Sequence, residues 1–197
     1  MENKGKNKKA CDVFGEVFQG FGRLDGRKVS KFHPYPLEEV LDYDSNTGDI
    51  RWIIHDPRHN IRLGKLAGSR SGKSGLYRSI GFQGIFISSH RIAWYLHYGY
   101  WSKAVEIDHI DGDPGNNKIN NLRECTKSQN QANRGPAKNN TSGYKGVTWD
   151  KTAKKWQSKI CFLGKWYFLG RYDDILEAHS AYSRAASKYF GEFARVR

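Results

Sequence analysis

The stretch VEIDHIDGDPGNNKINNLRECTKSQN, at residues 105–130, decides how the middle of the chain folds. The β-branched residues Val105, Ile107 and Ile110 favour a strand that carries the Asp108–His109 pair. A polar run, GDPGNNKIN, follows and indicates a loop. Residues 121–125 (NLREC) predict a second strand, and TKSQ at residues 126–129 matches a capping box, so a helix should begin there. We therefore expect a strand, a loop, a second strand and a helix in close succession.

This segment brings together a carboxylate, an imidazole and an amide that could act on a phosphodiester. Asp108 and the side-chain oxygen of Asn130 are hard oxygen ligands of the kind that suits Mg²⁺. The imidazole of His109 can take a proton from an attacking water. Adjacent residues of a strand point to opposite faces, so Asp108 and His109 share one site only if the strand is bulged or twisted at its end. A hydrogen-bonded Asp–His pair of structural role is the alternative that the residues leave open.

The residues before this stretch predict a further folded region that begins near Pro36. Two strand-like runs, at residues 77–82 and 85–88, predict a hairpin. Residues 90–98 carry apolar side chains at helical spacing and predict a helix that ends at Gly99. This region leads directly into the segment that carries the candidate chemistry.

The 105–130 string resembles the HNH endonuclease motif, in the form common among phage and intron-encoded homing enzymes. The first His of the motif corresponds to His109, the central Asn to Asn121, and the third position to Asn130, where other members often carry His. The resemblance extends over residues 36–134. It implies that His109 is the general base and that Asp108 and Asn130 hold one divalent ion. It also implies that Asn121 holds the loop by hydrogen bonds, so that the imidazole keeps its orientation.

The same resemblance implies the reaction and its cofactor. The expected ion is Mg²⁺, with Mn²⁺ as the alternative, and it would stabilise charge on a phosphate oxygen and on the departing 3′ oxygen. The products would be a 5′-phosphate and a 3′-hydroxyl. Asn at position 130, in place of the more common His, changes the ligand of the metal and bears on which metal is preferred.

The sequence after residue 140 predicts a second, small folded region. In residues 156–160 (WQSKI) apolar and polar side chains alternate, which predicts a strand with Gln157 and Lys159 on one face. Other short strand-like runs flank this one, and an alanine-rich helix is expected within residues 173–189. One face of the sheet should therefore be covered by the helix, and the other should display basic and aromatic side chains.

Residues 143–197 resemble the Apetala-two/ethylene-response-factor (AP2/ERF-like) DNA-binding domain, on the motifs GYKGV (143–147), KW (155–156) and LGRY (169–172). The resemblance implies that a three-stranded antiparallel sheet, packed on one helix, enters the major groove of double-stranded DNA. Two departures from the family, Thr148 and Trp166 in place of arginine, argue against the GC-rich target of that family. The positions that correspond to its DNA contacts are Lys145, Thr148, Gln157, Lys159, Lys165 and Trp166.

Charge and composition narrow the partners. Lysine and arginine number 33 against 20 acidic residues, for a net charge of +13. A chain this basic points to nucleic acid, because neutralising phosphates releases condensed counterions. The excess is densest in residues 141–197, whereas residues 36–140 are nearly balanced. We find no long basic amphipathic helix and no apolar run of about 18 residues, so we expect no membrane binding.

The cysteines and the N-terminus bear on the compartment. Cys11, Cys125 and Cys161 are odd in number and far apart, and they predict neither a disulfide framework nor a structural zinc site. The N-terminus is basic but has no apolar core, so no secretory signal is expected. We therefore expect a non-secreted, cytoplasmic protein of a bacterial or phage-infected cell.

The expected fold class is α+β, with a ββα-metal (HNH, His-Me finger) nuclease unit followed by a three-stranded antiparallel sheet packed on one helix. The four expected parts are a flexible basic arm (1–35), the nuclease domain (36–134), a linker (135–142) and the AP2/ERF-like domain (143–197). The expected function is a metal-dependent endonuclease of homing or phage type acting on double-stranded DNA, with a homodimer as one route to cutting both strands. Two alternatives stay open: a DNA-binding transcriptional regulator with a non-catalytic HNH scaffold, and a basic RNA-binding protein.

Overall fold

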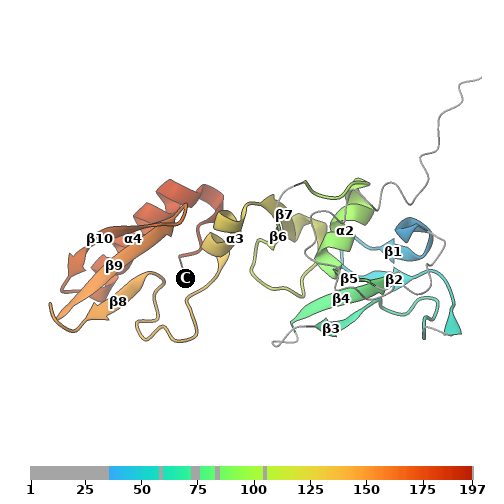
Figure 1. The fold of residues 1–197 in the computed structure, drawn as a ribbon, viewed down its shortest axis with the longest axis horizontal. Helices are drawn as coiled ribbons and strands as arrows, with labels where there is room; N and C mark the ends of the chain where they lie inside the picture. The colour runs from blue at the N-terminus through green and yellow to red at the C-terminus, as the bar shows by residue number, and fades with distance from the viewer. Residues whose placement is uncertain (1–35, 58–59, 72–75, 83–84, 104–105, 197) are drawn as a thin grey trace, which may run out of the picture. The chain divides into compact units, whose positions relative to one another are not determined.

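The structure is a computed structural model that describes residues 36–57, 60–71, 76–82, 85–103 and 106–196. The expected basic arm, residues 1–35, lies outside the described residues. The chain divides into two compact units, here called the N-terminal unit (residues 1–101 and 117–119) and the C-terminal unit (residues 102–116 and 120–197). Their helices and strands are labelled in Figure 1.

The N-terminal unit is built from short antiparallel strands and one helix (Figure 1). A 3-10 helix, η1 (Leu37–Glu39), precedes β1 (Leu41–Tyr43), which pairs with β2 (Ile50–Trp52). A second sheet has the order β3 (Ser69–Ser71), β4 (Tyr77–Phe82), β5 (Ile85–Ser88). Helix α2 (Ser89–Tyr98) follows at once and ends at Gly99, whose φ of 73° is the left-handed conformation common at helix ends. The expected hairpin and helix are thus present, and Ile80, Ile87 and Ile92 are buried among these elements.

The C-terminal unit begins with a hairpin and a short helix, here called the ββα motif. Strand β6 (Glu106–His109) pairs antiparallel with β7 (Leu122–Cys125), and a 3-10 turn, η3 (Ile119–Asn121), leads into β7. Helix α3 (Lys127–Asn133) begins with the capping box that the sequence predicts. The Thr126 hydroxyl accepts from the Gln129 N–H over 3.3 Å, and the Gln129 side chain accepts from the Thr126 N–H over 2.8 Å.

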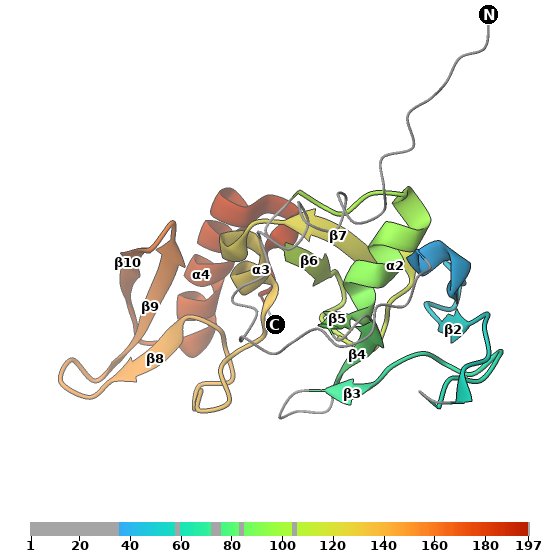
Figure 2. The ribbon, with the colours of Figure 1, turned by 45° about the vertical axis from the view of Figure 1, so that its right-hand side comes forward.

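The second half of this unit, residues 143–197, is here called the C-terminal module. Its strands β8 (Val147–Asp150), β9 (Lys155–Phe162) and β10 (Lys165–Tyr172) form an antiparallel sheet in the order β10-β9-β8. Helix α4 (Ile175–Phe190) packs on one face of this sheet (Figure 2), and η4 (Gly191–Phe193) follows it. The Asp174 side chain caps α4 by accepting from the Leu176 N–H over 2.9 Å.

The ββα motif and the C-terminal module share one hydrophobic core. Its buried members are Cys125, Ala132, Ile160, Tyr182, Ala186, Phe190 and Phe193. Cys125 lies on β7 and Ala132 on α3, and both belong to one buried cluster with residues of α4 and η4. The two compact units divide near residue 102, so the ββα motif and the C-terminal module belong to the same unit. The expected linker at residues 135–142 stays a prediction, and the shared core joins residues on both sides of that segment in the sequence.

Among the described helices, none is both long and apolar enough to cross a bilayer.

Candidate active site and nucleic-acid interface

A tight turn follows Asp108 and His109 at the end of β6. The Gly112 N–H donates to the His109 carbonyl over 2.8 Å, and the Ile110 N–H donates to the Asn121 carbonyl over 2.8 Å. Gly112 has a φ of 74°, a conformation that costs about 1–2 kcal/mol for a residue with a side chain. The strand thus stops directly after the histidine, and glycine lets the chain reverse there.

The side chain of Asn121 ties this turn to the loop that follows it. Asn121 is buried; its Oδ1 accepts from the Asp111 N–H over 3.0 Å, and its Nδ2 donates to Asp111 Oδ1 over 2.9 Å and to the Asn116 carbonyl over 2.8 Å. One amide therefore holds both ends of the loop. This is the contact pattern that the expected loop-holding role of Asn121 requires.

Asp111 is the acceptor at the centre of the loop. Partial burial acts to raise the pKa of its carboxyl, but hydrogen bonds from the Asp113 N–H and from the Asn116 and Asn121 side chains outweigh that effect. A positive charge on the nearby His109 acts in the same direction, so the pKa of Asp111 lies below its ordinary value. The loop is therefore built around an ionised carboxylate next to the histidine.

Asp108, an expected metal ligand, is buried and already has two partners. Its Oδ2 accepts from Nε and one terminal nitrogen of Arg123 over 3.1 and 3.0 Å. The Asn133 Nδ2 lies 3.1 and 2.9 Å from the two carboxylate oxygens and 2.7 Å from the His109 carbonyl. Arg123 and Asn133 thus fix the carboxylate, and sequence reasoning missed both.

Asn130, the other expected metal ligand, points toward the same strand. Its Nδ2 donates to Glu106 Oε2. Glu106 and Asp108 are two residues apart on β6, and Asn130 and Asn133 are three apart on α3, so each pair shares a face. The two side-chain amides of α3 therefore lie beside the two carboxylates of β6, with Asn130 at Glu106 and Asn133 at Asp108.

His109 lies on the opposite face of the hairpin from Asp108. The pairing of β6 with β7 runs without a bulge, with Asp108 opposite Arg123 and His109 opposite Leu122. Alternation along the strand then directs the two side chains to opposite faces. Asp108 and His109 were expected to share one site only if the strand is bulged or twisted at its end. The structure has no bulge there, and regular strand geometry ends at the turn of residues 109–112. His109 itself is buried, with 6% of its surface exposed.

The oxygen ligands of this motif fit a hydrated hard cation better than a closed metal cage. In the described part of the chain, no group of three or more His, Cys, Asp or Glu side chains is placed to hold a metal ion. Mg²⁺ does not require such a cage, because it keeps several waters and binds through one or two carboxylates. Asp108 and Asn130 supply such oxygens, and Glu106 lies beside them.

Comparison with known proteins agrees with this geometry. A model of the HNH endonuclease family matches residues 89–132, which include β6, β7 and most of α3. Protein 3.8 of Escherichia phage T7 is 36% identical over 108 residues, which cover 55% of this chain and 88% of that protein. The chain belongs to the same family as protein 3.8 and carries an HNH endonuclease domain at residues 89–132. Membership indicates a nuclease with a nucleic-acid substrate, and HNH nucleases generally depend on a divalent metal ion.

A second relative is similar over a shorter stretch. The AP2-like ethylene-responsive transcription factor TOE2 of Arabidopsis thaliana is 32% identical over 80 residues, which cover 41% of this HNH protein and 16% of that factor. No solved structure matches the chain.

Four of the six expected DNA-contact residues lie on one open face of the C-terminal sheet. The register places Thr148 opposite Gln157, Lys159 opposite Phe168, and Trp166 opposite Cys161. The other face of β9 carries buried Ser158 and Ile160, against α4. Trp166 is 71% exposed and Phe168 55%, which is high for aromatic side chains. Thr148, Gln157, Lys159 and Trp166 were expected as DNA contacts, and Phe168 lies beside them on this face.

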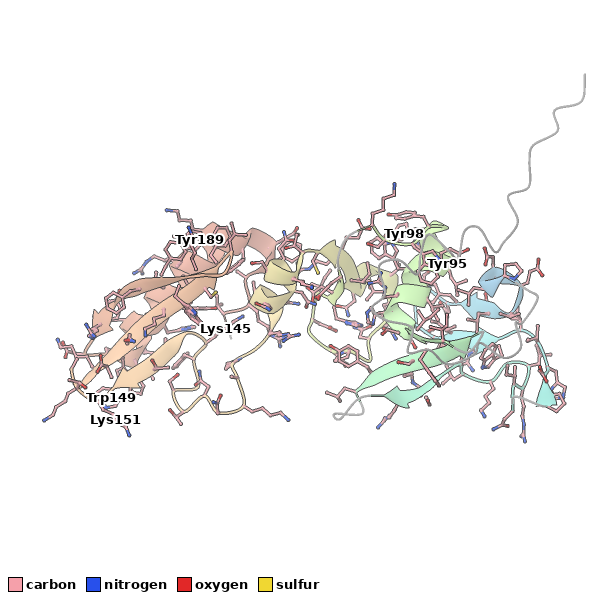
Figure 3. The ribbon with its side chains drawn as sticks, viewed as in Figure 1. Tyr95, Tyr98, Lys145, Trp149, Lys151 and Tyr189 are labelled. Carbon is pink, nitrogen blue, oxygen red and sulfur yellow. The ribbon has the colours of Figure 1, made fainter. Side chains whose placement is uncertain are left out.

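Lys145, also an expected DNA contact, lies elsewhere. Its ammonium donates to the carbonyls of Gln131, Ala132 and Arg134 over 3.2, 2.5 and 2.6 Å, at the end of α3 (Figure 3). Burial lowers the pKa of Lys145 to about 8, and the charges of Arg195 and Arg134 add to the effect. The expectation of a DNA contact is corrected here: the free carbonyls of a helix end attract a cation, and this lysine caps α3.

Lys165 is at the start of β10, opposite Phe162. Phe162 stacks on Tyr189 of α4 with ring centroids 4.8 Å apart, so this pair of positions faces the helix side of the sheet. Lys165 is exposed at the end of its strand. Its position therefore does not share the open face with Lys159 and Trp166.

Proposed function

We propose that this HNH protein is a metal-dependent DNA endonuclease. Its ββα motif would hydrolyse a phosphodiester, and the open face of its C-terminal sheet would bind double-stranded DNA. One observation carries the proposal: the turn after His109 is held by Asn121 within the segment that matches the HNH family. An imidazole next to a fixed turn, in a motif whose opposite strand face carries carboxylates and amides, supplies the groups that general-base hydrolysis needs.

The residues of the chain take separate roles in this proposal. The imidazole of His109 accepts the proton of a water, the water oxygen attacks phosphorus, and the bond to the 3′ oxygen breaks. The products are a 5′-phosphate and a 3′-hydroxyl. Asp108 and Asn130 are the proposed holders of the divalent ion, Mg²⁺ with Mn²⁺ as the alternative. The chemistry that such an ion supplies is stabilisation of charge on the phosphate as the bond breaks. Asn121 keeps the 109–112 turn in place.

The open sheet face is the proposed DNA-binding surface. Lys159 supplies positive charge, Thr148 and Gln157 supply hydrogen-bonding groups, and Trp166 and Phe168 supply exposed apolar surface. The net charge of +13 supports a polyanionic partner. The major groove admits a sheet of this size, and side chains on one face could reach base edges there. Similarity to the AP2-like transcription factor supports a nucleic-acid-binding role for this chain.

A second function, a DNA-binding regulator with a non-catalytic HNH scaffold, is favoured by one specific contact. The carboxylate of Asp108 is already neutralised by Arg123 at 3.0 Å and hydrogen-bonded by Asn133. A carboxylate that no longer binds a metal ion, and is paired with protein groups instead, would have these contacts. The two functions differ in whether the protein cuts DNA at all.

Incubation with supercoiled plasmid separates the two functions. The full-length protein is incubated with Mg²⁺, with Mn²⁺ and with a chelator, and the products are resolved as supercoiled, nicked and linear forms. We expect nicked or linear DNA with either metal and none with chelator, and products that T4 ligase reseals because they carry a 5′-phosphate. Binding without cleavage under all conditions would favour the regulator. Cleavage that persists in chelator would contradict the metal-dependent reaction.

A further inference from the structure

The end of the chain reaches back onto the turn that carries the proposed general base. After η4, the Arg195 N–H donates to the Ala132 carbonyl of α3 over 3.3 Å. A terminal nitrogen of the Arg195 guanidinium then donates to the Asp111 carbonyl over 3.1 Å. The donor and acceptor of this last bond are 84 residues apart in the sequence. The C-terminal module thus contacts the 109–112 turn directly.

Gly112 has no side chain, and the Arg195 guanidinium occupies the space that a Cβ would take. A Cβ at position 112 would lie 1.8 Å from a terminal nitrogen of Arg195, so a side chain there would push the flexible guanidinium aside. The positive φ of Gly112 favours glycine, and the present contact with Arg195 depends on it. The Asp111–Gly112 peptide is held at its carbonyl by Arg195 and at its N–H, that of Gly112, by the His109 carbonyl. With both sides held, the peptide cannot rotate without breaking a hydrogen bond.

The same module grips the ββα motif at two further points. Lys145 caps α3 through three carbonyls, and its pKa is lowered partly by the charge of Arg195 nearby. Arg123, which binds Asp108, also donates to the Glu192 carbonyl over 3.1 Å and lies 3.9 Å above the Phe193 ring. Each proposed element of the active site (turn, helix and carboxylate) therefore has a partner in the C-terminal module.

From these contacts we infer that Arg195 is a positioning residue for the nuclease. Its guanidinium fixes the Asp111–Gly112 peptide and, through that peptide, the orientation of His109. Both DNA binding and the cleavage step therefore depend on the C-terminal module. The inference rests on the proposed endonuclease function. Arg195 acts through the turn and not on the DNA, so its loss should lower kcat and leave KM nearly unchanged.

The test compares Arg195→Ala and Arg195→Lys with Arg184→Ala. Arg184 is exposed on α4 and donates a hydrogen bond to the Ser180 hydroxyl. Arg184→Ala therefore removes one positive charge, as Arg195→Ala does, but at a position away from the turn. We expect Arg195→Ala to lower kcat by about 10- to 100-fold, the range for a small misplacement of a catalytic group, with KM and DNA affinity within about threefold. Arg195→Lys should recover part of kcat, because an ammonium can still donate to the Asp111 carbonyl. Arg184→Ala should cut at the wild-type rate.

A second pair of variants tests the contact between Arg195 and the 109–112 turn by changing the turn instead of the arginine. Gly112→Ala displaces the guanidinium and strains the turn, whereas Gly64→Ala has a similar φ of 75° with no heavy atom within 4 Å of its added Cβ. We expect Gly112→Ala to lower kcat as Arg195→Ala does, and Gly64→Ala to leave it unchanged. Amide hydrogen exchange at Gly112 should speed up in Arg195→Ala, while amides of β9 keep their wild-type rates.

Three results would overturn the inference. They are an unchanged kcat in Arg195→Ala, a raised KM at unchanged kcat (which would make Arg195 a DNA contact), or an unchanged exchange rate at Gly112. The exchange measurement needs no activity, so it still decides the matter if the protein does not cut DNA. His109→Ala in the same assay distinguishes failure of the positioning role from failure of the proposed function. If His109→Ala loses cleavage and Arg195→Ala keeps the wild-type rate, the positioning role is contradicted and the endonuclease function is not.

Discussion

Removing the guanidinium of Arg123 should destabilise the C-terminal unit far more than an average substitution does. In the ion pair with Asp108, the side chains of Arg123 and Asp108 are only 13% and 6% exposed. Breaking a buried pair by removing one partner costs about 3–5 kcal/mol, because the other charge stays buried without its counter-ion. Asn133 still donates to the carboxylate, which favours the lower end of that range. For Arg123→Ala we expect a loss of about 3 kcal/mol in the free energy of unfolding.

Arg171→Ala is the matched control, because the same residue type forms an ion pair of similar length in the same unit. The Arg171–Asp150 distance is 2.8 Å, and the arginine and aspartate side chains are 47% and 15% exposed. Because water reaches the arginine, we expect the control to lose about 1 kcal/mol, well below the loss for Arg123→Ala. Urea unfolding in chelator, followed by circular dichroism, gives both values.

The double variant Arg123→Met with Asp108→Asn separates the buried charge from the lost packing. Replacing both partners leaves no buried ion, so this variant should lose less stability than Arg123→Ala alone. Mg²⁺ should raise the midpoint of Arg123→Ala more than that of the wild type, because an orphaned carboxylate is a better cation ligand. Equal losses for Arg123→Ala and Arg171→Ala would refute this account of Asp108.

Three further outcomes follow from the same contacts. A chain ending at residue 137 should lose the cooperative unfolding of its ββα motif in a urea titration, because Cys125 and Ala132 lose the cover of α4; a sharp, wild-type-like transition for that motif would contradict the shared core. Asp111 has a lowered pKa when folded, so it stabilises the protein above its ordinary pKa and loses that effect as pH falls; Asp111→Asn should lower stability at pH 7 and flatten the acid side of the stability–pH curve. Lys159→Gln should reduce the slope of log affinity against log salt by about 0.9 in a DNA-binding titration without changing the unfolding midpoint, and an unchanged slope would remove it from the DNA-binding surface.

Local patterns in the sequence were sufficient for several elements of the fold. The Thr126–Gln129 capping box depends on residues three apart, and the structure contains it. Strand β6 ends at His109, within the run that the β-branched residues predicted. Such features are set by neighbours along the chain, and no knowledge of packing is needed to find them.

The contacts that organise the candidate site depend on register and packing, which no local pattern contains. Arg123 meets Asp108 only because β7 pairs with β6 in one register, and a shift of one residue would turn it to the other face. Lys145 was expected at DNA because the sequence does not show that the end of α3 lies beside it. Arg195 meets Asp111 across 84 residues. Each of these required the shared core to be known first.

Cleavage by His109→Ala, measured beside its DNA affinity, tests the central claim most directly. The imidazole acts on water and adds little to the binding of intact DNA, so the variant should bind within a few-fold of the wild type. Its rate of plasmid cleavage in Mg²⁺ should fall to the background of the chelator control. Cleavage by His109→Ala at the wild-type rate would contradict the assignment of the general base and, with it, the proposed active site.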